Sequence, residues 1–329
     1  MDSQSGGPST EQLSTSEAVH RRTGRTFYLA TRLFPRRIRE ATHVCYAFFR
    51  LADEVVDDPD DAQCAGQYRE LARIEAAALG RRSTDDPVLD AFAALRERYD
   101  VPAHEVRTFI DAMRMDLELD RYESHDELSR YLRGSSVAVG NIMLSVMAPH
   151  DPGTARPHAA ALAEAFQLTN FLRDVREDVL QHDRVYLPQE TLDRFGVTDE
   201  QVRSLTYSDA FADAIRSELR RTEALYRRGV EGIGYLPADC QFPVLLAAVL
   251  YAEHHRLIRA RECDVLSARP TLSWPRRLAV LARTWWHWRR SGDPVSTFEA
   301  ASAVPSPSDD DRHRVAHRSR SLVRRLFRA

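Results

Sequence analysis

The sequence contains no lysine, so all 46 of its basic side chains are arginines. It also has no marked excess of charge of either sign, because 49 acidic residues leave a formal net charge of only −3. A nearly neutral chain creates no overall field that attracts nucleic acid, and we expect no such partner. Its four cysteines lie far apart and form no CxxC pair. This spacing argues against a disulfide framework and favours a reduced, cytoplasmic protein.

Long apolar runs and glycine-rich fingerprints are missing as well. No uncharged apolar stretch reaches the roughly 18 residues of a membrane-spanning helix. The polar start, MDSQSGGPSTEQ, has no apolar signal core. No glycine-rich dinucleotide fingerprint is present, so NADPH is not expected as a cofactor. Contact with a membrane surface stays open.

Helix-forming residues fill most of the chain, and alternating β-branched runs are scarce. Hydrophobic residues make up 43 %, enough for a substantial core. Helices are expected over 16–33, 37–57, 63–80, 87–99, 103–120, 125–147, 155–180, 189–194, 199–203, 208–232, 239–262 and 273–290. We therefore predict one all-α domain over 16–295, after a disordered N-terminus over 1–15. A linker and an arginine-rich tail are expected over 296–329.

Two acidic DxxxD motifs lie far apart in this helical chain. Asp53 and Asp57 form the first pair, and Asp174 and Asp178 form the second. Residues i and i+4 share one face of a helix, so each motif points two carboxylates the same way. Mg²⁺ prefers oxygen ligands and usually takes one or two carboxylates together with substrate phosphates. Two facing motifs could therefore hold Mg²⁺, or Mn²⁺, and a diphosphate between them.

A single acidic i,i+4 pair more often lies on a solvated helix face. Here the first motif follows YAFFRLA and the second follows AFQLTNFL, and apolar residues surround nearly the whole circumference of both segments. Such segments are typical of buried helices. Carboxylates are rarely buried without a partner or a metal. The context therefore favours a metal site.

Residues beside the two motifs have matching chemistry. Arg50 and Arg173 offer planar forks of donors suited to phosphate oxygens. Asn170 and Gln167 precede Asp174 by four and seven residues, on its face of the helix. Asn170 could add a neutral oxygen ligand, and Gln167 could bind phosphate or water. Tyr46 precedes Asp53 by seven residues and is either a packed aromatic or a substrate contact.

These motifs resemble those of the squalene/phytoene synthase family, the head-to-head isoprenyl diphosphate synthases, over roughly residues 20–290. The resemblance rests on four segments in the same order. They are Tyr46–Asp58 (YAFFRLADEVVDD), Asp116-Leu117 with Arg121-Tyr122, Gln167–Asp178 (QLTNFLRDVRED) and Arg184–Pro188 (RVYLP). The family implies a single-domain, all-α isoprenoid synthase fold with a central cavity.

The resemblance also implies roles for individual residues. Asp53, Asp57, Asn170, Asp174 and Asp178 would hold Mg²⁺ or Mn²⁺. Arg50, Arg173 and Arg184 would contact diphosphate, and Tyr46, Gln167, Tyr131, Tyr186 and Tyr251 would line the reaction cavity. Thr23, Gly24, Arg25, Thr26 and Phe27 align with a diphosphate-binding turn, with Gly24 and Thr26 where serine is usual. The run GSSVAVG at 134–140 corresponds to a helix break that lines the cavity.

The implied reaction is the head-to-head condensation of two geranylgeranyl diphosphates to phytoene, through a cyclopropyl diphosphate and without a reductant. A squalene- or dehydrosqualene-type enzyme that uses farnesyl diphosphate is an alternative. A non-catalytic assembly factor of the same fold is an alternative of another class, although such relatives tend to lose aspartates that are present here.

The C-terminal region from Arg276 onward has 12 arginines against five acidic residues, and its segment RRLAVLARTWWHWRR mixes arginine with tryptophan. Basic helices with aromatic side chains can lie on anionic membranes. Peripheral contact with the inner face of the cell membrane is therefore an expectation. The alternatives are a solvated or disordered tail over 312–329 and a tryptophan-bearing helix that simply caps the core.

Overall fold

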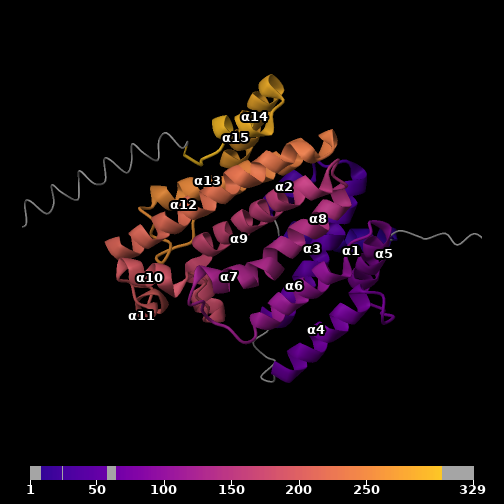
Figure 1. Ribbon diagram of the computed structural model, residues 1–329, viewed down its shortest axis with the longest axis horizontal. Coiled ribbons are helices and arrows are strands. Elements are labelled where there is room, and N and C mark those ends of the chain that lie inside the picture. Colours follow the sequence, from indigo (N-terminus) through magenta and orange to yellow (C-terminus); the bar gives the residue numbers. More distant parts are fainter. Residues whose placement is uncertain (1–8, 24, 58–63, 306–329) are drawn as a thin grey trace, which may run out of the picture.

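The computed structural model of the chain describes residues 9–23, 25–57 and 64–305. The side chains at positions 10, 22, 23, 25–27 and 64 lie outside this description. Every regular element in the described part is helical (Figure 1), which confirms the predicted all-α class. Within the same ranges no helix is long and apolar enough to cross a membrane.

The helices follow one another with short connections. Their bounds are α1 Thr10–Thr23, α2 Arg25–Thr31, α3 Arg36–Asp57, α4 Cys64–Ala78, α5 Pro87–Arg98, α6 Ala103–Met115 and α7 His125–Leu132. The π-helical turn η1 Arg133–Ala138 leads into α8 Val139–Met147. Then come α9 Pro152–His182, α10 Gln189–Phe195, α11 Asp199–Arg203, α12 Asp209–Glu231 and the 3₁₀ turn η2 Gly232–Tyr235. The last helices are α13 Ala238–Ala260, α14 Trp274–Ser291 and α15 Pro294–Ala301.

The long helix α9 is the centre of the molecule. It packs against α12, α13, α8 and η1, and Figure 1 shows the other long helices lying beside it in a layered bundle. Asp151 caps its first turn by accepting a hydrogen bond from the backbone N–H of Thr154 at 3.1 Å, with Pro152 at the first helical position. The helix ends at His182, and the C-cap residue Asp183 adopts a left-handed conformation with φ 52°.

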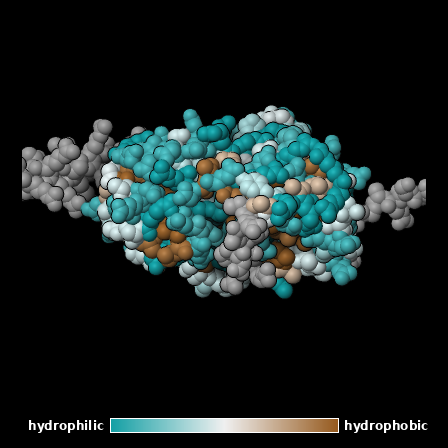
Figure 2. Space-filling model, turned by 90° about the horizontal axis from the view of Figure 1, so that it is seen from below, coloured by the Kyte–Doolittle hydropathy of each residue, from teal (hydrophilic) through white to brown (hydrophobic). Residues whose placement is uncertain are grey.

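A large apolar core lies between α3, α5, α6, α8, α9 and α13. A second apolar cluster joins the last turns of α9 to α10, α11 and the start of α12. Hydrophilic residues cover most of the face in Figure 2, and hydrophobic residues appear there in separate groups. Cys45, Cys240 and Cys263 are buried free thiols, as their spacing predicts.

Several predicted boundaries are wrong. Residues 10–15 belong to α1 and are not disordered, while residues 1–8 lie outside the described part. The helix predicted over 16–33 is two helices, α1 and α2. The linker predicted from 296 is wrong for 296–305, because α15 packs Phe298 and Ala301 into the core and Val304 follows them. The rest of the predicted tail, 306–329, is not described.

The predicted helix break at 134–140 is a change of winding. One helical rod runs from α7 through η1 to α8. A Cβ on Gly134 would lie 2.3 Å from the carbonyl oxygen of Thr108, so a glycine here allows η1 to pack closely on α6. Local π-helical turns occur often at functional sites. Ser135, Ser136, Val139 and Gly140 do line the central cavity, as the resemblance implied.

Candidate active site

The bundle encloses a cavity of about 1050 Å³. Every sequence-predicted site residue whose side chain is described lines it. These residues are Tyr46, Arg50, Asp53, Asp57, Tyr131, Gln167, Asn170, Arg173, Asp174, Asp178, Arg184, Tyr186 and Tyr251. The predicted turn at 23–27 cannot be placed in the same way, because its side chains are not described. Residues more than a hundred positions apart in the sequence thus share one cavity.

The first DxxxD motif occupies the last turn of α3. Arg50 lies one turn earlier, with its Nη1 4.0 Å from an Asp53 carboxylate oxygen and 3.7 Å from one of Asp57. Asp57 also lies 3.6 Å from Arg184 and 3.5 Å from His182. Burial raises the pKa of Asp53 to about 7, and the neighbouring Asp57 carboxylate adds to the rise. Without a bound cation, Asp53 is therefore reluctant to ionise.

The second DxxxD motif lies on α9, on the same cavity. Asp174 is held between two arginines, with Arg173 donating at 2.6 Å and Arg269 contacting it at 2.8 and 3.1 Å. Asp178 forms no ion pair with an arginine among the described residues. Burial and the Asp174 carboxylate raise the pKa of Asp178 to about 8. The two motifs therefore each hold one carboxyl group whose charge is destabilised.

A buried carboxylate, Asp116, lies beside the first motif, after the end of α6. It accepts hydrogen bonds from the hydroxyls of Tyr131 at 2.8 Å and Tyr186 at 3.2 Å. Burial raises the pKa of Asp116 to about 6, against the opposing effect of Arg184 and the two hydroxyls. Arg184 donates to the backbone carbonyl of Asp116 at 2.8 Å. These contacts fix the arginine that faces Asp57.

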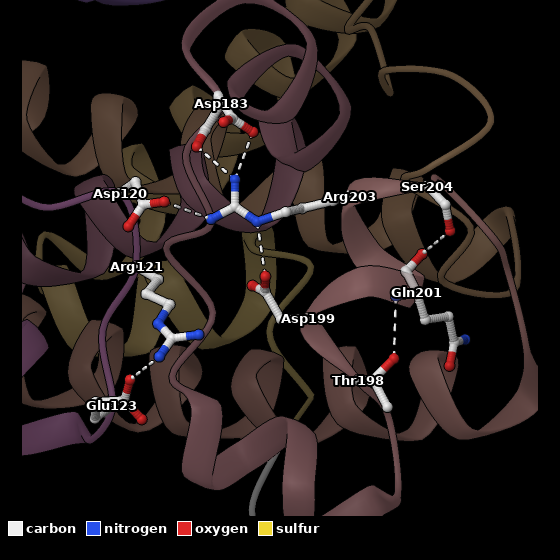
Figure 3. Close-up of polar contacts among 9 residues, drawn as sticks. All are labelled: Asp120, Arg121, Glu123, Asp183, Thr198, Asp199, Gln201, Arg203 and Ser204. Atoms are coloured by element: carbon white, nitrogen blue, oxygen red, sulfur yellow. Dashed lines mark hydrogen bonds and ion pairs between the residues drawn. The ribbon is translucent and has the colours of Figure 1, made fainter.

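Outside the cavity, Arg203 of α11 fixes the segment that carries Arg184 (Figure 3). Its guanidinium contacts three carboxylates, those of Asp120 at 2.9 Å, Asp199 at 2.7 Å and Asp183. It also donates to the backbone carbonyl of Asp183 at 2.7 Å. The two segments on either side are joined directly, since Val185 N–H donates to the carbonyl of Asp120 at 2.8 Å.

The other end of the cavity is apolar. Phe34, Leu144, Met147, Ala155, Ala159, Ile233 and Leu236 line it. Ala159 precedes Asp174 by 15 residues on α9, which corresponds to roughly 22 Å along the helix. The cavity thus has a charged end formed by both DxxxD motifs and an apolar end well removed from it.

The charged end fits a divalent cation shared with a phosphate ligand. No three acidic, histidine or cysteine side chains in the described part of the chain are close enough to hold an ion alone. The amide oxygen of Asn170 is buried and has no hydrogen-bond partner among the described residues. An ion here would take ligands from Asn170 and the carboxylates, and the remainder from water and diphosphate oxygens.

Sequence reasoning assigned no site role to several charged or titratable residues of this cavity, among them Arg269, His182 and Asp116. Arg269 lies in the connection between α13 and α14, where no motif marks it, yet it pairs with Asp174 and with Glu177 at 2.8 Å. His182 ends α9 and lies near Asp57 only because the helices converge. In the sequence, Asp116 stands out only as part of a segment shared with the family. Its burial and its two tyrosine donors give it a structural place in the site.

Comparisons with known proteins identify the family of the chain. A model of the squalene/phytoene synthase family matches residues 20–277. The chain belongs to this family. It is similar to the 15-cis-phytoene synthase of Synechococcus elongatus, with 32 % identity over 83 % of this chain and 94 % of the relative. It is also similar to the phytoene synthase of Mycobacterium tuberculosis, with 32 % identity over 81 % of this chain and 88 % of the relative.

One longer relative and two solved structures of other proteins are also similar to this member of the squalene/phytoene synthase family. Phytoene synthase 3, chloroplastic, of Zea mays is 32 % identical, and the match covers 81 % of this chain and 64 % of the relative. The crystal structure of a dehydrosqualene synthase in complex with ligand superposes with a TM-score of 0.77 and 25 % identity, over 85 % of this chain and 97 % of that one. The squalene synthase HpnC from Alicyclobacillus acidocaldarius superposes with a TM-score of 0.67 and 22 % identity. The match covers 77 % of this chain and 94 % of that one, and it supports the fold. The protein is thus an all-α prenyltransferase.

Proposed function

We propose that the protein is a 15-cis-phytoene synthase. It would join two geranylgeranyl diphosphates head to head, with Mg²⁺ or Mn²⁺ and without NADPH. The observation that carries the proposal is the single cavity in which both DxxxD motifs and four arginines, Arg50, Arg173, Arg184 and Arg269, meet at one end of an apolar chamber. The names of the relatives in Synechococcus elongatus and Mycobacterium tuberculosis support phytoene as the product.

The charged end would bind the diphosphate groups of both substrates. Asp53, Asp57, Asn170, Asp174 and Asp178 would hold the divalent cations. Bound there, these ions would supply charge neutralisation for the leaving diphosphate. The arginines would add donors to the diphosphate oxygens, and charge-assisted hydrogen bonds of this kind also orient the substrate.

The apolar walls would protect the reaction from water. In the first half, the C1–O bond of one substrate breaks, diphosphate leaves with the electron pair, and the double bond of the second substrate attacks C1. Loss of one proton closes a cyclopropyl ring that keeps the second diphosphate. In the second half that diphosphate leaves, the carbon skeleton rearranges, and loss of another proton gives phytoene. Two diphosphates and two protons are released, and no electrons are exchanged with a reductant.

A farnesyl diphosphate enzyme is the second candidate, because the structure with a TM-score of 0.77 is that of a dehydrosqualene synthase. The long apolar end of the cavity, with small Ala155 and Ala159 in its wall, supports the longer substrate. The two candidates differ only in the prenyl chain that this end accommodates.

Product analysis tests the proposal. Purified protein is given geranylgeranyl or farnesyl diphosphate with MgCl₂ and no NADPH, and the hydrocarbons are identified by mass spectrometry. We expect phytoene from geranylgeranyl diphosphate at the higher kcat/KM. Turnover of farnesyl diphosphate alone would overturn the assignment of the substrate. Diphosphate release that is equal in wild type and in Asp53→Asn would overturn the site itself and revive the non-catalytic alternative.

A further inference from the structure

We propose that the exposed face of α14 binds the surface of an anionic lipid bilayer. Seven large hydrophobic side chains are exposed in the described part of the chain, and four of them belong to this helix. Trp274 is 57 % exposed, Trp286 54 %, Trp285 49 % and Leu278 44 %. Figure 1 shows α14 at the outside of the molecule, beside α13 and α15. Exposed apolar side chains gathered in this way mark interaction sites.

Three of these side chains form one stripe. At about 100° per residue, positions 274, 278 and 285 fall within roughly 40° of one another around the helix axis. The buried side chains Val280 and Thr284 lie roughly 140° and 100° around the helix from the centre of this stripe, on the side toward the core. The edge of Trp285 also contacts the ring of Phe242 on α13, with ring centroids 5.3 Å apart. Trp285 thus packs this part of the stripe against α13.

The positive charge of α14 favours an anionic partner. The helix contains five arginines and no acidic residue. Two of them, Arg276 and Arg283, face the buried carboxylate of Glu253 on α13, at 2.8 and 3.7 Å, and attach the helix to the core. Arg289 and Arg290 instead are exposed and stack over the rings of Trp285 and Trp286, at 5.6 and 3.7 Å. Arginine beside tryptophan at one level suits the boundary between lipid head groups and acyl chains.

The same face adjoins the reaction cavity. A groove lined by Arg21, Tyr28, Leu29, Arg32, Leu272, Trp274 and Arg277 lies between α1, α2 and the start of α14. Leu272 and Arg277 also line the large cavity. A bilayer on α14 would thus lie next to one wall of the active site. An apolar product would have a short path into lipid there, a consequence that rests on the proposed function, whereas the binding itself does not.

Lipid accounts for this surface better than a second protein. A protein partner would need acidic groups to match Arg289 and Arg290, and a second copy of α14 would place arginine against arginine. An anionic bilayer supplies negative charge at any orientation and accepts the tryptophan rings at its interface. We therefore commit to phospholipid head groups such as phosphatidylglycerol.

Tryptophan fluorescence tests the proposal with unusual selectivity, because all four tryptophans of the chain lie on α14. The full-length protein is mixed with phosphatidylcholine vesicles that contain either no phosphatidylglycerol or a large fraction of it. The same vesicles are also prepared with brominated acyl chains, which quench only nearby indoles. We expect a blue shift and bromine quenching with anionic vesicles, both weakened by salt. Arg289→Glu/Arg290→Glu should weaken binding roughly tenfold or more.

The control, Arg81→Glu/Arg82→Glu, reverses the charge of two other consecutive, exposed arginines in the connection between α4 and α5. It should bind the vesicles like the wild type. A second variant, Trp274→Gln/Leu278→Gln, keeps the charge and should lose quenching. Three results would overturn the proposal: vesicle sedimentation without quenching, a blue shift that follows protein concentration without vesicles, and equal effects of the two arginine reversals. Diphosphate release measured in detergent reports on the proposed function separately, so either hypothesis can fail alone.

Discussion

Arg203 holds Asp183 by its backbone and its side chain at once, since Nη1 donates to the carbonyl oxygen at 2.7 Å and to the carboxylate. Asp183 has φ 52°, a conformation that residues other than glycine adopt reluctantly. The next residue is Arg184, whose guanidinium lies 3.6 Å from Asp57 inside the cavity. A partly buried residue outside the cavity thus positions an arginine of the active site.

Loss of this contact should reduce activity more than it reduces stability. We expect Arg203→Gln to lower the free energy of unfolding by about 1–2 kcal/mol and kcat/KM by roughly tenfold, because Arg184 loses its fixed position. Arg121→Gln is the control, since Arg121 is exposed and its ion pair in Figure 3 is with Glu123, at 2.8 Å. Steady-state kinetics and urea unfolding measure the two effects. Equal kinetics for the two variants would contradict the positioning role.

The metal-free protein should lose stability as the pH rises. The folded-state pKa values of Asp116, Asp53 and Asp178 are about 6, 7 and 8, all above the ordinary value of 3.8. The folded state therefore keeps protons that the unfolded chain releases from about pH 4 upward, so the stability falls between pH 4 and 8 and then levels off. We expect a loss on the order of 2 kcal/mol, because water in the cavity screens these carboxylates.

Neutral variants provide the matching check on this pH dependence. In the presence of EDTA, Asp178→Asn should be more stable than the wild type at pH 8.5 and equal to it at pH 4, an order that thermal unfolding at both pH values reveals. MgCl₂ with a prenyl diphosphate analogue should remove the difference at high pH. If Asp178→Asn were less stable than the wild type at pH 8.5, the ionised Asp178 carboxylate would not destabilise the metal-free protein, and the prediction would be wrong.

Arg269 should contribute to the binding of substrate diphosphate. We expect Arg269→Gln to raise KM roughly tenfold with a smaller change in kcat, the size of one charge-assisted hydrogen bond. Arg261→Gln is the control, because Arg261 is an exposed arginine of the same connection whose Nε donates to the backbone carbonyl of Asp264 at 3.3 Å. An unchanged KM in Arg269→Gln would show that this arginine only holds Asp174.

The apolar end of the cavity should set the length of the prenyl chain. We expect Ala159→Phe to lower kcat/KM for geranylgeranyl diphosphate at least about tenfold more than for farnesyl diphosphate, because the new ring occupies the far end of the chamber. Ala160→Phe lies one residue along α9 and outside the cavity lining, and it serves as the control. Equal losses of kcat/KM for the two substrates would show that the prenyl chain does not reach this end of the cavity.

Most of the fold could be predicted because helix signals are local. Asp151-Pro152 and Ser208 mark helix starts by capping, and the helix positions follow from composition and period. α15 was missed because its residues, VSTFEAA after a proline, resemble a linker in sequence, and only packing of Phe298 under α12 and α13 makes them a helix of the core. The winding of η1 was missed for a similar reason. It depends on the close approach of α6 to Gly134.

The carboxylate motifs of the site could be predicted because each lies within one helical turn. Their convergence on one cavity followed from the family resemblance, and the structure brings Asp53 and Asp174 to that cavity. Arg269 and Arg203 act through contacts between segments about 80 to 95 residues apart in the sequence. No local pattern marks such residues, so they could be found only from the folded chain.

Crystals grown with MnCl₂ and a non-reactive thiolodiphosphate analogue of geranylgeranyl diphosphate test the central claim most directly, through the anomalous scattering of manganese. The account predicts manganese peaks bridging the analogue's diphosphate to Asp53 or Asp57 on α3 and to Asp174 or Asp178 on α9. Peaks away from these four carboxylates, or a diphosphate bound outside the cavity, would contradict it.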